Sequence, residues 1–249
     1  MSLPKLSYTI WFSQRTGSTW FCEVLAATGV AGRPAEFLNH TSLEDALKHY
    51  GTANRSDLIA RLHMEGMTPN GIFGIKQGYH EPAFSRLLDG IAGPDNGPTR
   101  LSRWERAFPN HRHIFMTRRN KLRLAVSWWR AIQSQEWHRR TGDRAAPIDL
   151  ADKYDANAID YLMQQAVLRE AGLQEMFTEA DVAPLTIVYE DAVMDLIASI
   201  NATLRHLGLP AVETVPPGLS MERISDSVSE EWVQRFRIDR QAGWTNPGW

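Results

Sequence analysis

The chain has 249 residues, of which 43% are hydrophobic and 22% charged, and its formal net charge is −2. This composition excludes a disordered or collagen-like chain, and the near-neutral balance argues against a nucleic-acid-binding protein. No apolar run approaches the ~20 residues of a membrane-spanning helix, and the run at residues 6–12 is too short for a secretory signal. The single cysteine, Cys22, excludes an internal disulfide and favours a reducing compartment, so we expect a cytoplasmic protein.

β-Forming apolar runs predict four strands, and helical periodicity predicts helices between them. The expected strands cover residues 6–12, 71–75, 113–117 and 185–189. The expected helices cover residues 18–28, 121–137, 161–177, 193–207 and 230–240. Strands that alternate with helices imply a mostly parallel sheet covered on both faces. We therefore predict an α/β, three-layer, P-loop-like fold in a single domain, residues 1–249, with a surface loop at 90–98 and a lid at 135–149.

Positive charge is concentrated in the middle of the chain. Between Arg100 and Arg144, eleven arginines and one lysine stand against three acidic residues, a net charge of +9. The planar guanidinium binds phosphate or sulfate through two parallel hydrogen bonds. Most of these arginines are expected to form a solvated surface, and only those at strand or helix ends are candidates for binding an anion.

A strand, a short turn with Gly17, and a helix that opens with Ser18 and Thr19 predict an anion site near the N-terminus. The first N–H groups of a helix have no internal partners and lie at its positive dipole end. Gly17 allows close approach of the backbone, the two hydroxyls can cap the helix, and Arg15 adds a positive charge.

This loop differs from the ATP-binding pattern G-x-x-x-x-G-K-[ST], because its leading glycine is absent and Ser18 occupies the lysine position. The third strand ends in Arg118 and Arg119 where a metal site needs a carboxylate. Only Glu190 and Asp191, after the fourth strand, can imitate such a carboxylate, and the histidines are not spaced as metal ligands. We therefore expect an anion site without a metal.

Two motifs resemble those of sulfotransferases that use 3′-phosphoadenosine 5′-phosphosulfate (PAPS). Gln14-Arg-Thr-Gly-Ser-Thr-Trp20 is similar to their 5′-phosphosulfate loop. Arg118-Arg-Asn-Lys-Leu-Arg-Leu-Ala-Val-Ser127 resembles their 3′-phosphate motif. Further stretches at residues 28–37, 127–131 and 232–236 are similar to the bacterial trehalose 2-sulfotransferase family, in the expected order along the chain.

The resemblance implies a set of donor-binding residues. In the first loop it implies Arg15, Thr16, Gly17, Ser18 and Thr19, with Trp20 at the adenine. For the 3′-phosphate it implies Ser127 and an arginine, for which both Arg118 and Arg119 have suitable spacing; we favour Arg118. Tyr189 and Arg223 match positions near the nucleotide.

The resemblance also implies the catalytic residues. Glu36, in Gly32-Arg-Pro-Ala-Glu-Phe37, matches the proposed general base, and residues 29–36 are long enough to return to the loop from the end of the first helix. Arg15 and Lys76 are candidate electrophilic groups beside the transferring sulfuryl group.

An acceptor site is expected from exposed aromatic side chains and Glu36. Tyr79, Trp128 and Trp137 are candidates for stacking on a sugar, although tryptophans at helical spacing are more often part of a core. Lys76-Gln-Gly-Tyr-His80 departs from the trehalose branch, so trehalose, another glycoside and a glycolipid all stay open as acceptors. The resemblance allows a homodimer.

Three functions follow as hypotheses. The first is a PAPS-dependent carbohydrate sulfotransferase, which the two motifs favour. The second is a magnesium-ATP-dependent P-loop kinase that uses Glu190 and Asp191. The third is a non-catalytic module that binds a nucleotide or a glycan.

Overall fold

The computed structural model describes residues 3–40, 42–93, 97–143, 149–214 and 227–241. Its chain divides into two compact units. The first comprises Met1–Arg119 with Arg169–Leu219, and the second comprises Asn120–Leu168 with Ser220–Trp249. The single domain expected for residues 1–249 stays a prediction.

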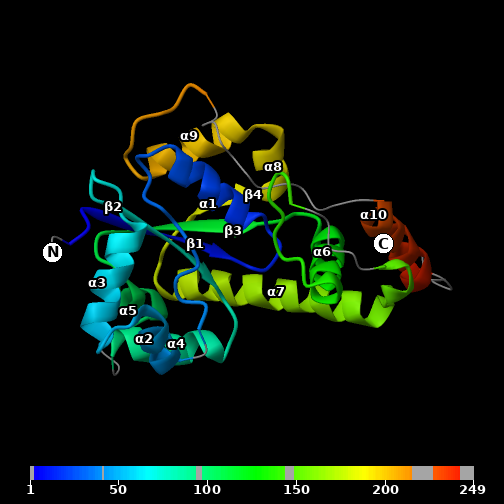
Figure 1. Ribbon diagram of the computed structural model, residues 1–249, viewed down its shortest axis with the longest axis horizontal. Helices are drawn as coiled ribbons and strands as arrows, with labels where there is room; N and C mark the ends of the chain where they lie inside the picture. The colour runs from blue at the N-terminus through cyan, green and yellow to red at the C-terminus, as the bar shows by residue number, and fades with distance from the viewer. Residues whose placement is uncertain (1–2, 41, 94–96, 144–148, 215–226, 242–249) are drawn as a thin grey trace. The chain divides into compact units, whose positions relative to one another are not determined.

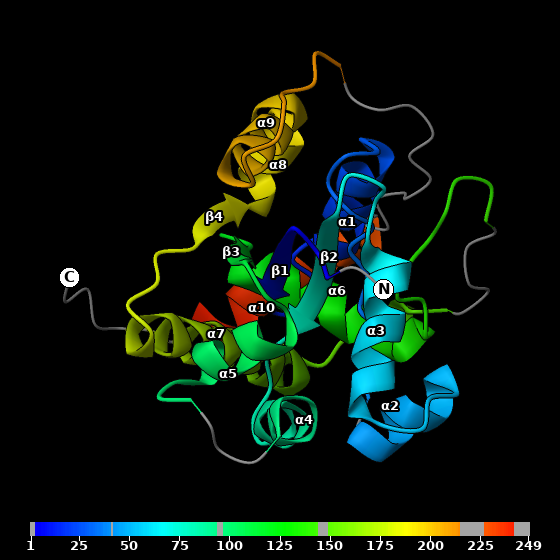
Figure 2. The same cartoon turned by 90° about the vertical axis from the view of Figure 1, so that its left-hand side faces the viewer.

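A parallel sheet organises the first unit. Its strands are β1 (Leu6–Phe12), β2 (Ile72–Gly78), β3 (His111–Thr117) and β4 (Leu185–Val188). They lie in the order β2-β1-β3-β4, which can be followed in Figure 2. Phe12 is in register with both Gly78 and Met116, so the carboxyl ends of three strands lie along one edge. Open parallel sheets bind their ligands at this edge.

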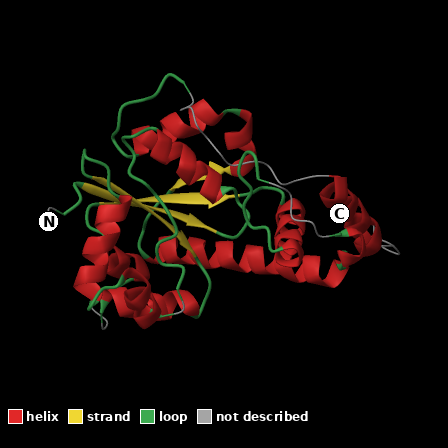
Figure 3. Cartoon of the chain, viewed as in Figure 1, coloured by secondary structure: helices red, strands yellow, loops and turns green. Residues whose placement is uncertain are grey.

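Helices cover both faces of the sheet (Figures 1 and 3). The helices on one face are α1 (Ser18–Ala27), α8 (Tyr189–Met194) and α9 (Leu196–His206). Those on the other are α2 (Leu43–Tyr50), α3 (Arg55–Gly66), α4 (Ala83–Ala92), α5 (Arg100–Ala107) and residues 169–179 of α7 (Ala156–Glu179). Strand residues alternate between the faces, so Ile10 packs in the core with α1 while Trp11 packs in the opposite core. The predicted three-layer α/β architecture is confirmed.

The second unit is helical. It contains α6 (Lys121–Ser134), the short 3-10 helix η1 (Ala151–Lys153), residues 156–168 of α7, and α10 (Ser227–Gln241). An apolar core that includes Leu124, Ile159 and Trp232 joins these helices. A 2.7 Å ion pair between Arg123 and Glu230 also connects α6 to α10. In the described part of the chain, every helix is too short or too polar to cross a membrane.

Several predicted boundaries need correction. Helices α2 to α5 were absent from the prediction, and α4 occupies the start of the loop expected at residues 90–98. β2 runs on through Gly78, so Lys76 lies inside the strand and does not follow it. The helix expected at residues 193–207 is two helices, because Asp195 ends α8 and its carboxylate caps α9 at Ala198. Within the expected lid, residues 144–148 lie outside the described residues, so the lid stays a prediction.

Candidate active site

The loop between β1 and α1 lies at the carboxyl edge of the sheet. Arg15 and Gly17 have left-handed backbone, with φ of 64° and 79°. The hydroxyl of Thr16 donates a 3.0 Å hydrogen bond to the carbonyl oxygen of Ser13, which closes the loop. The N-cap of α1 is Gly17, so the expected capping by Ser18 or Thr19 is wrong. Since glycine has no capping side chain, the first N–H groups of α1 remain suited to an external anion.

Tyr189 and Arg118 lie against this loop. A Cβ at Gly17 would come within 2.5 Å of the Tyr189 ring, so only glycine fits here without a shift. Trp20 meets the same ring edge-on, with centroids 6.4 Å apart. The guanidinium carbon of Arg118 lies 4.8 Å from the Tyr189 centroid, and its Nη1 donates a 3.4 Å hydrogen bond to the carbonyl oxygen of Arg15. Four of the predicted donor-binding residues therefore lie together at this loop: Gly17, Trp20, Arg118 and Tyr189.

Arg118 and Arg119 have different surroundings. The side chain of Arg118 is 12% exposed and lies against the loop. The side chain of Arg119 is 63% exposed and pairs at 2.9 Å with Asp191. Only Arg118 is therefore placed beside the first predicted motif.

The two carboxylates after β4 are both engaged by these arginines. An oxygen of Glu190 accepts a 2.8 Å hydrogen bond from the backbone N–H of Arg119, and the other lies 3.9 Å from Nε of Arg118. Asp191 accepts both of its hydrogen bonds from Nη2 of Arg119. Among the described residues, no three histidine, cysteine or acidic side chains form a group that could hold a metal.

Lys76 connects the predicted base to the predicted anion loop. Its Nζ lies 2.9 Å from Oε2 of Glu36 and donates a 2.9 Å hydrogen bond to Oγ1 of Thr19 in the first turn of α1. The Lys76 side chain is buried, whereas that of Glu36 is 31% exposed. A buried ammonium is retained only with partners that offset its desolvation, and both partners belong to the predicted site.

The backbone explains how Glu36 reaches this position. The N–H of Lys76 donates a 2.9 Å hydrogen bond to the carbonyl oxygen of Ala35, which fixes the segment against β2. Gly32 has a φ of 73°, and a Cβ there would lie 2.8 Å from the backbone nitrogen of Gly74. Glycine at position 32 therefore lets the chain pass close to β2 and return to the loop.

Cys22 is a buried residue of α1, as predicted. Burial raises the pKa of its thiol to about 12, and the positive charge of Lys76 opposes this shift only in part. The thiol therefore stays protonated at neutral pH.

The three aromatic residues predicted to stack on a sugar differ in accessibility. Tyr79 is part of the core, and its hydroxyl accepts a 2.6 Å hydrogen bond from Arg100. Trp128 is buried in the core of the second unit. Stacking needs an open ring face, so neither residue fits the predicted role. Trp137 is 38% exposed and lies beyond the end of α6, so its role stays a prediction.

Two predicted donor-binding residues are not assembled with the others. Ser127 lies on α6 in the second unit, and its pairing with Arg118 stays a prediction. Arg223 lies outside the described residues, and its role also stays a prediction.

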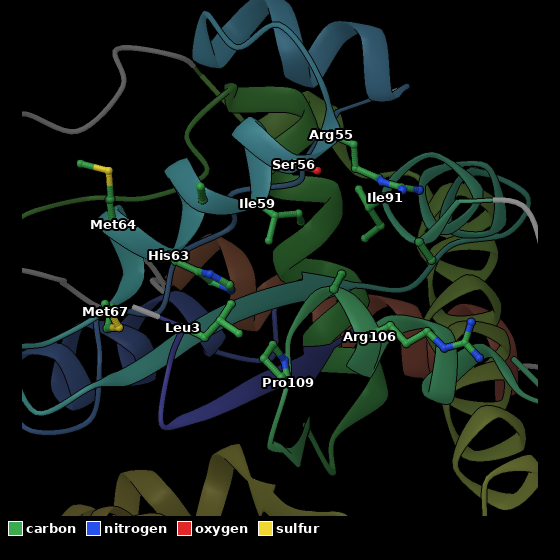
Figure 4. Close-up of a pocket in the computed structure, with 13 residues that line it drawn as sticks. Leu3, Arg55, Ser56, Ile59, His63, Met64, Met67, Ile91, Arg106 and Pro109 are labelled. Carbon is green, nitrogen blue, oxygen red and sulfur yellow. The ribbon is translucent and has the colours of Figure 1, made fainter. Parts of the chain in front are cut away.

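A separate cavity of about 780 Å³ lies between α3 and α5, near the amino ends of β1 and β3 (Figure 4). Leu3, Ile59, His63 and Pro109 are among its lining residues, and none of the predicted site residues is. The cavity is thus distinct from the carboxyl-edge site.

Sequence reasoning missed two carboxylates that organise the site. The sequence suggests Glu190 only as an imitation of a metal-binding carboxylate, whereas in the structure it lies in the first turn of α8, 3.9 Å from Nε of Arg118. Glu170, on α7, accepts hydrogen bonds from the ends of β1 and β3. It belongs to no motif, so the sequence contains no signal for it.

Comparisons with known proteins identify the family of the chain. The sequence model of the family described as Stf0 sulphotransferase matches residues 7–239. The chain is 30% identical to a trehalose 2-sulfotransferase of Mycolicibacterium smegmatis, over 97% of this chain and 98% of the relative. It is 28% identical to the trehalose 2-sulfotransferase of Mycobacterium tuberculosis, over 96% and 97% of the two chains.

Among solved structures, the sulfotransferase domain from the curacin biosynthetic pathway superposes with a TM-score of 0.52 at 15% identity. The superposition covers 97% of this chain and 99% of that domain, and it supports the fold. Because the family match spans nearly the whole described sequence, the chain belongs to the Stf0 sulphotransferase family.

Proposed function

We propose that this protein transfers the sulfuryl group of PAPS to a hydroxyl of a carbohydrate or glycolipid, with Glu36 as the general base. The observation that carries the proposal is the bridge formed by Lys76, because it joins the Glu36 carboxylate to the first turn of α1. Sulfuryl transfer to an alcohol needs a base for the hydroxyl proton and positive groups beside the phosphosulfate. The proposed base and the proposed anion-binding helix end belong to one hydrogen-bonded group, which supports the proposal.

The loop residues fit the 5′-phosphosulfate of the donor. Gly17 gives α1 a first turn without a capping side chain, which suits backbone N–H groups that bind a doubly charged anion. Arg15 and Lys76 add positive charge, and Tyr189 with Trp20 offers aromatic surface beside the loop. Arg118, held at the loop by the carbonyl of Arg15, is our choice for the 3′-phosphate, together with Ser127 and Arg223.

In the proposed reaction, the acceptor oxygen forms a bond to sulfur while the bond from sulfur to the 5′-phosphate oxygen breaks. The electron pair of that bond leaves with 3′-phosphoadenosine 5′-phosphate (PAP), and the hydroxyl proton goes to Glu36. General-base assistance of this kind accelerates a reaction about 10²–10⁴-fold. Lys76 holds the carboxylate in place and, with Arg15, brings positive charge to the group in transfer.

A carbohydrate acceptor is proposed because both curated relatives are named for the sulfation of trehalose. The partly exposed Glu36 gives such an acceptor access to the base. Trp137, which is 38% exposed, is our candidate for an aromatic contact with the sugar.

The kinase alternative receives no support from the contacts at β4. A magnesium site needs free carboxylate oxygens, whereas Glu190 and Asp191 are bonded to Arg119. The binding-module alternative differs from our proposal in turnover alone.

The test combines binding and turnover. PAP and ATP are titrated by calorimetry, each with and without EDTA, and transfer of labelled sulfate from PAPS is measured with trehalose, other glycosides and glycolipids. We expect PAP to bind without a divalent ion and label to enter at least one sugar. Magnesium-dependent ATP binding without a response to PAP would overturn the proposal, and PAP binding without transfer to any sugar would favour a binding module.

We propose further that the enzyme is cytoplasmic and that it forms a homodimer. Sedimentation velocity distinguishes one subunit from two, and cell fractionation locates the protein.

A further inference from the structure

Glu170 is a buried carboxylate on α7 that the proposed reaction does not use. Its side chain is nearly covered, since the residue is 7% exposed. Oε1 accepts a 3.0 Å hydrogen bond from the hydroxyl of Ser13, and Oε2 accepts a 2.8 Å hydrogen bond from the hydroxyl of Thr117. One carboxylate therefore connects two segments that are more than 100 residues apart in sequence.

The two hydroxyls occupy corresponding places in neighbouring strands. Ser13 directly follows β1 and opens the anion loop, and Thr117 is the last residue of β3, directly before Arg118. β1 and β3 are paired in the sheet, so Glu170 joins their carboxyl ends side by side. The segments that it joins carry the groups proposed to bind opposite ends of PAPS.

The loop between β1 and α1 contains a strained residue, which contacts with α7 would stabilise. Arg15 has a left-handed φ of 64°. A residue other than glycine keeps this strained backbone conformation when the surrounding structure holds it in place. Neighbouring Arg169 donates a hydrogen bond to the side chain of Gln14, so α7 contacts the loop at two successive residues. The bond from Thr16 to the Ser13 carbonyl adds a third constraint.

We propose that Glu170 is a positioning residue that fixes the distance between the 5′-phosphosulfate loop and the 3′-phosphate arginine. This role rests on the proposed function. Glu170 acts through Ser13 on the loop and through Thr117 on Arg118. Replacement of either hydroxyl frees one segment, whereas replacement of the carboxylate by an apolar group frees both.

The experiment uses three probes: PAP, adenosine 5′-phosphate and adenosine 3′-phosphate. Dissociation constants are measured for the full chain as wild type and with Ser13→Ala, Thr117→Val, Glu170→Gln and Glu170→Leu. Each of the first two variants removes one hydroxyl at nearly constant volume. Ser85→Ala is the control, because Ser85 on α4 also donates a hydrogen bond to a carboxylate, at 2.9 Å to Glu81, and neither residue belongs to the proposed donor site.

We expect Ser13→Ala to weaken the binding of adenosine 5′-phosphate and of PAP about fivefold, which is the usual effect of losing one hydrogen bond. The binding of adenosine 3′-phosphate should be unchanged. Thr117→Val should weaken PAP and adenosine 3′-phosphate to a similar degree and spare adenosine 5′-phosphate. Glu170→Leu should lose affinity for all three probes, and Glu170→Gln should restore PAP binding to within about threefold, because an amide can hydrogen-bond both hydroxyls. The Ser85→Ala control should bind as the wild type does.

Selective losses of this kind would support the positioning role, since general destabilisation weakens all probes alike. If Ser13→Ala and Thr117→Val bind every probe as the wild type does, or weaken all three equally, Glu170 has only a structural role. Failure of the wild type itself to bind PAP would instead overturn the proposed function, and the positioning role with it.

Discussion

The two edges of the parallel sheet bury polar groups in different ways. At the carboxyl edge, the buried cation Lys76 is paired with Glu36, and Arg118 lies beside Glu190. At the amino edge, two of the polar side chains are imidazoles, and burial lowers the pKa of His63 to about 4 and that of His111 well below its ordinary value. Burial of charge is costly and is retained where a partner offsets it. The buried cation with a carboxylate partner thus lies at the carboxyl edge, which is the edge that we propose binds an anion.

Glu36→Gln tests the carboxyl edge most directly and should have the largest effect. The amide cannot accept the acceptor's proton, so turnover should fall at least about 100-fold, in line with general-base catalysis. PAP affinity should stay within about threefold. The measurements are labelled-sulfate transfer and calorimetric titration of PAP.

Glu65→Gln is the control for this variant. Glu65 is 33% exposed and pairs at 2.8 Å with Arg61 on α3, so its exposure and pairing resemble those of Glu36. Turnover should be unchanged in the control. Undiminished turnover in Glu36→Gln would remove Glu36 from its proposed role.

Arg118→Ala and Arg119→Ala separate two neighbours with unlike surroundings. Loss of a charged hydrogen bond costs about 1.5–3 kcal/mol, so Arg118→Ala should weaken PAP about 10–100-fold. Adenosine 5′-phosphosulfate, which lacks the 3′-phosphate, should lose far less. Arg119→Ala should change either affinity less than threefold, because its side chain is exposed and pairs with Asp191.

Competition binding with the two nucleotides measures both variants. Equal losses for the two nucleotides in Arg118→Ala would show that this arginine serves another purpose. If Arg119→Ala lowers the affinity for PAP more than Arg118→Ala does, Arg119 and not Arg118 binds the 3′-phosphate.

Gly17→Ala compared with Gly51→Ala tests the contact between the loop and Tyr189. Both glycines have positive φ, so each alanine suffers backbone strain of about 1–2 kcal/mol. A Cβ at Gly17 also meets the Tyr189 ring at 2.5 Å, whereas no described atom lies within 4 Å of a Cβ at Gly51. PAP affinity should fall about tenfold in Gly17→Ala and stay at the wild-type value in Gly51→Ala, although chemical denaturation should show both to be less stable. Unchanged PAP affinity in Gly17→Ala would contradict the placement of the donor at this loop.

The sequence was sufficient for the sheet and for the first loop, because both depend on local patterns. Apolar runs marked all four strands, and Gly17 before an amphipathic helix marked the anion loop. The missed helices α2, α3 and α5 had readable signals, since Ser42, Asn54 and Thr99 each cap a helix through the N–H three residues later. Helices α2 and α5 have eight residues each, too few for an apolar pattern to recur over several turns.

The contacts within the site could not be predicted from local sequence patterns. Lys76 faces α1 because β2 pairs with β1 in a particular register, and a shift of one residue would turn it to the other face. Both Arg118 and Arg119 have suitable spacing in the sequence, with Arg118 favoured, and the structure places only Arg118 of the two against the loop. Tyr79 was assigned to a sugar platform because burial cannot be inferred from an isolated aromatic residue.

His63→Leu tests the amino edge and should have the smallest effect. The folded protein holds the pKa of His63 at about 4, below the ordinary value of 6.5 in an unfolded chain. Between these values the unfolded chain binds a proton that the folded chain does not, so stability falls as the pH falls from 6.5 to 4 and this contribution is then exhausted. One such proton gives a slope of at most about 1.4 kcal/mol per pH unit.

The leucine variant should lose this slope and keep the part due to His111, whose pKa is lowered in the same direction. Urea unfolding at several pH values between 7 and 4.5 measures the difference. A leucine also fills the place of an imidazole whose Nε2 has no hydrogen-bond partner among the described residues, so stability at pH 7 should not fall by more than about 1 kcal/mol. Identical acid slopes in the two proteins would show that His63 is protonated in the folded state, and the amino edge would then bury a charge as the carboxyl edge does.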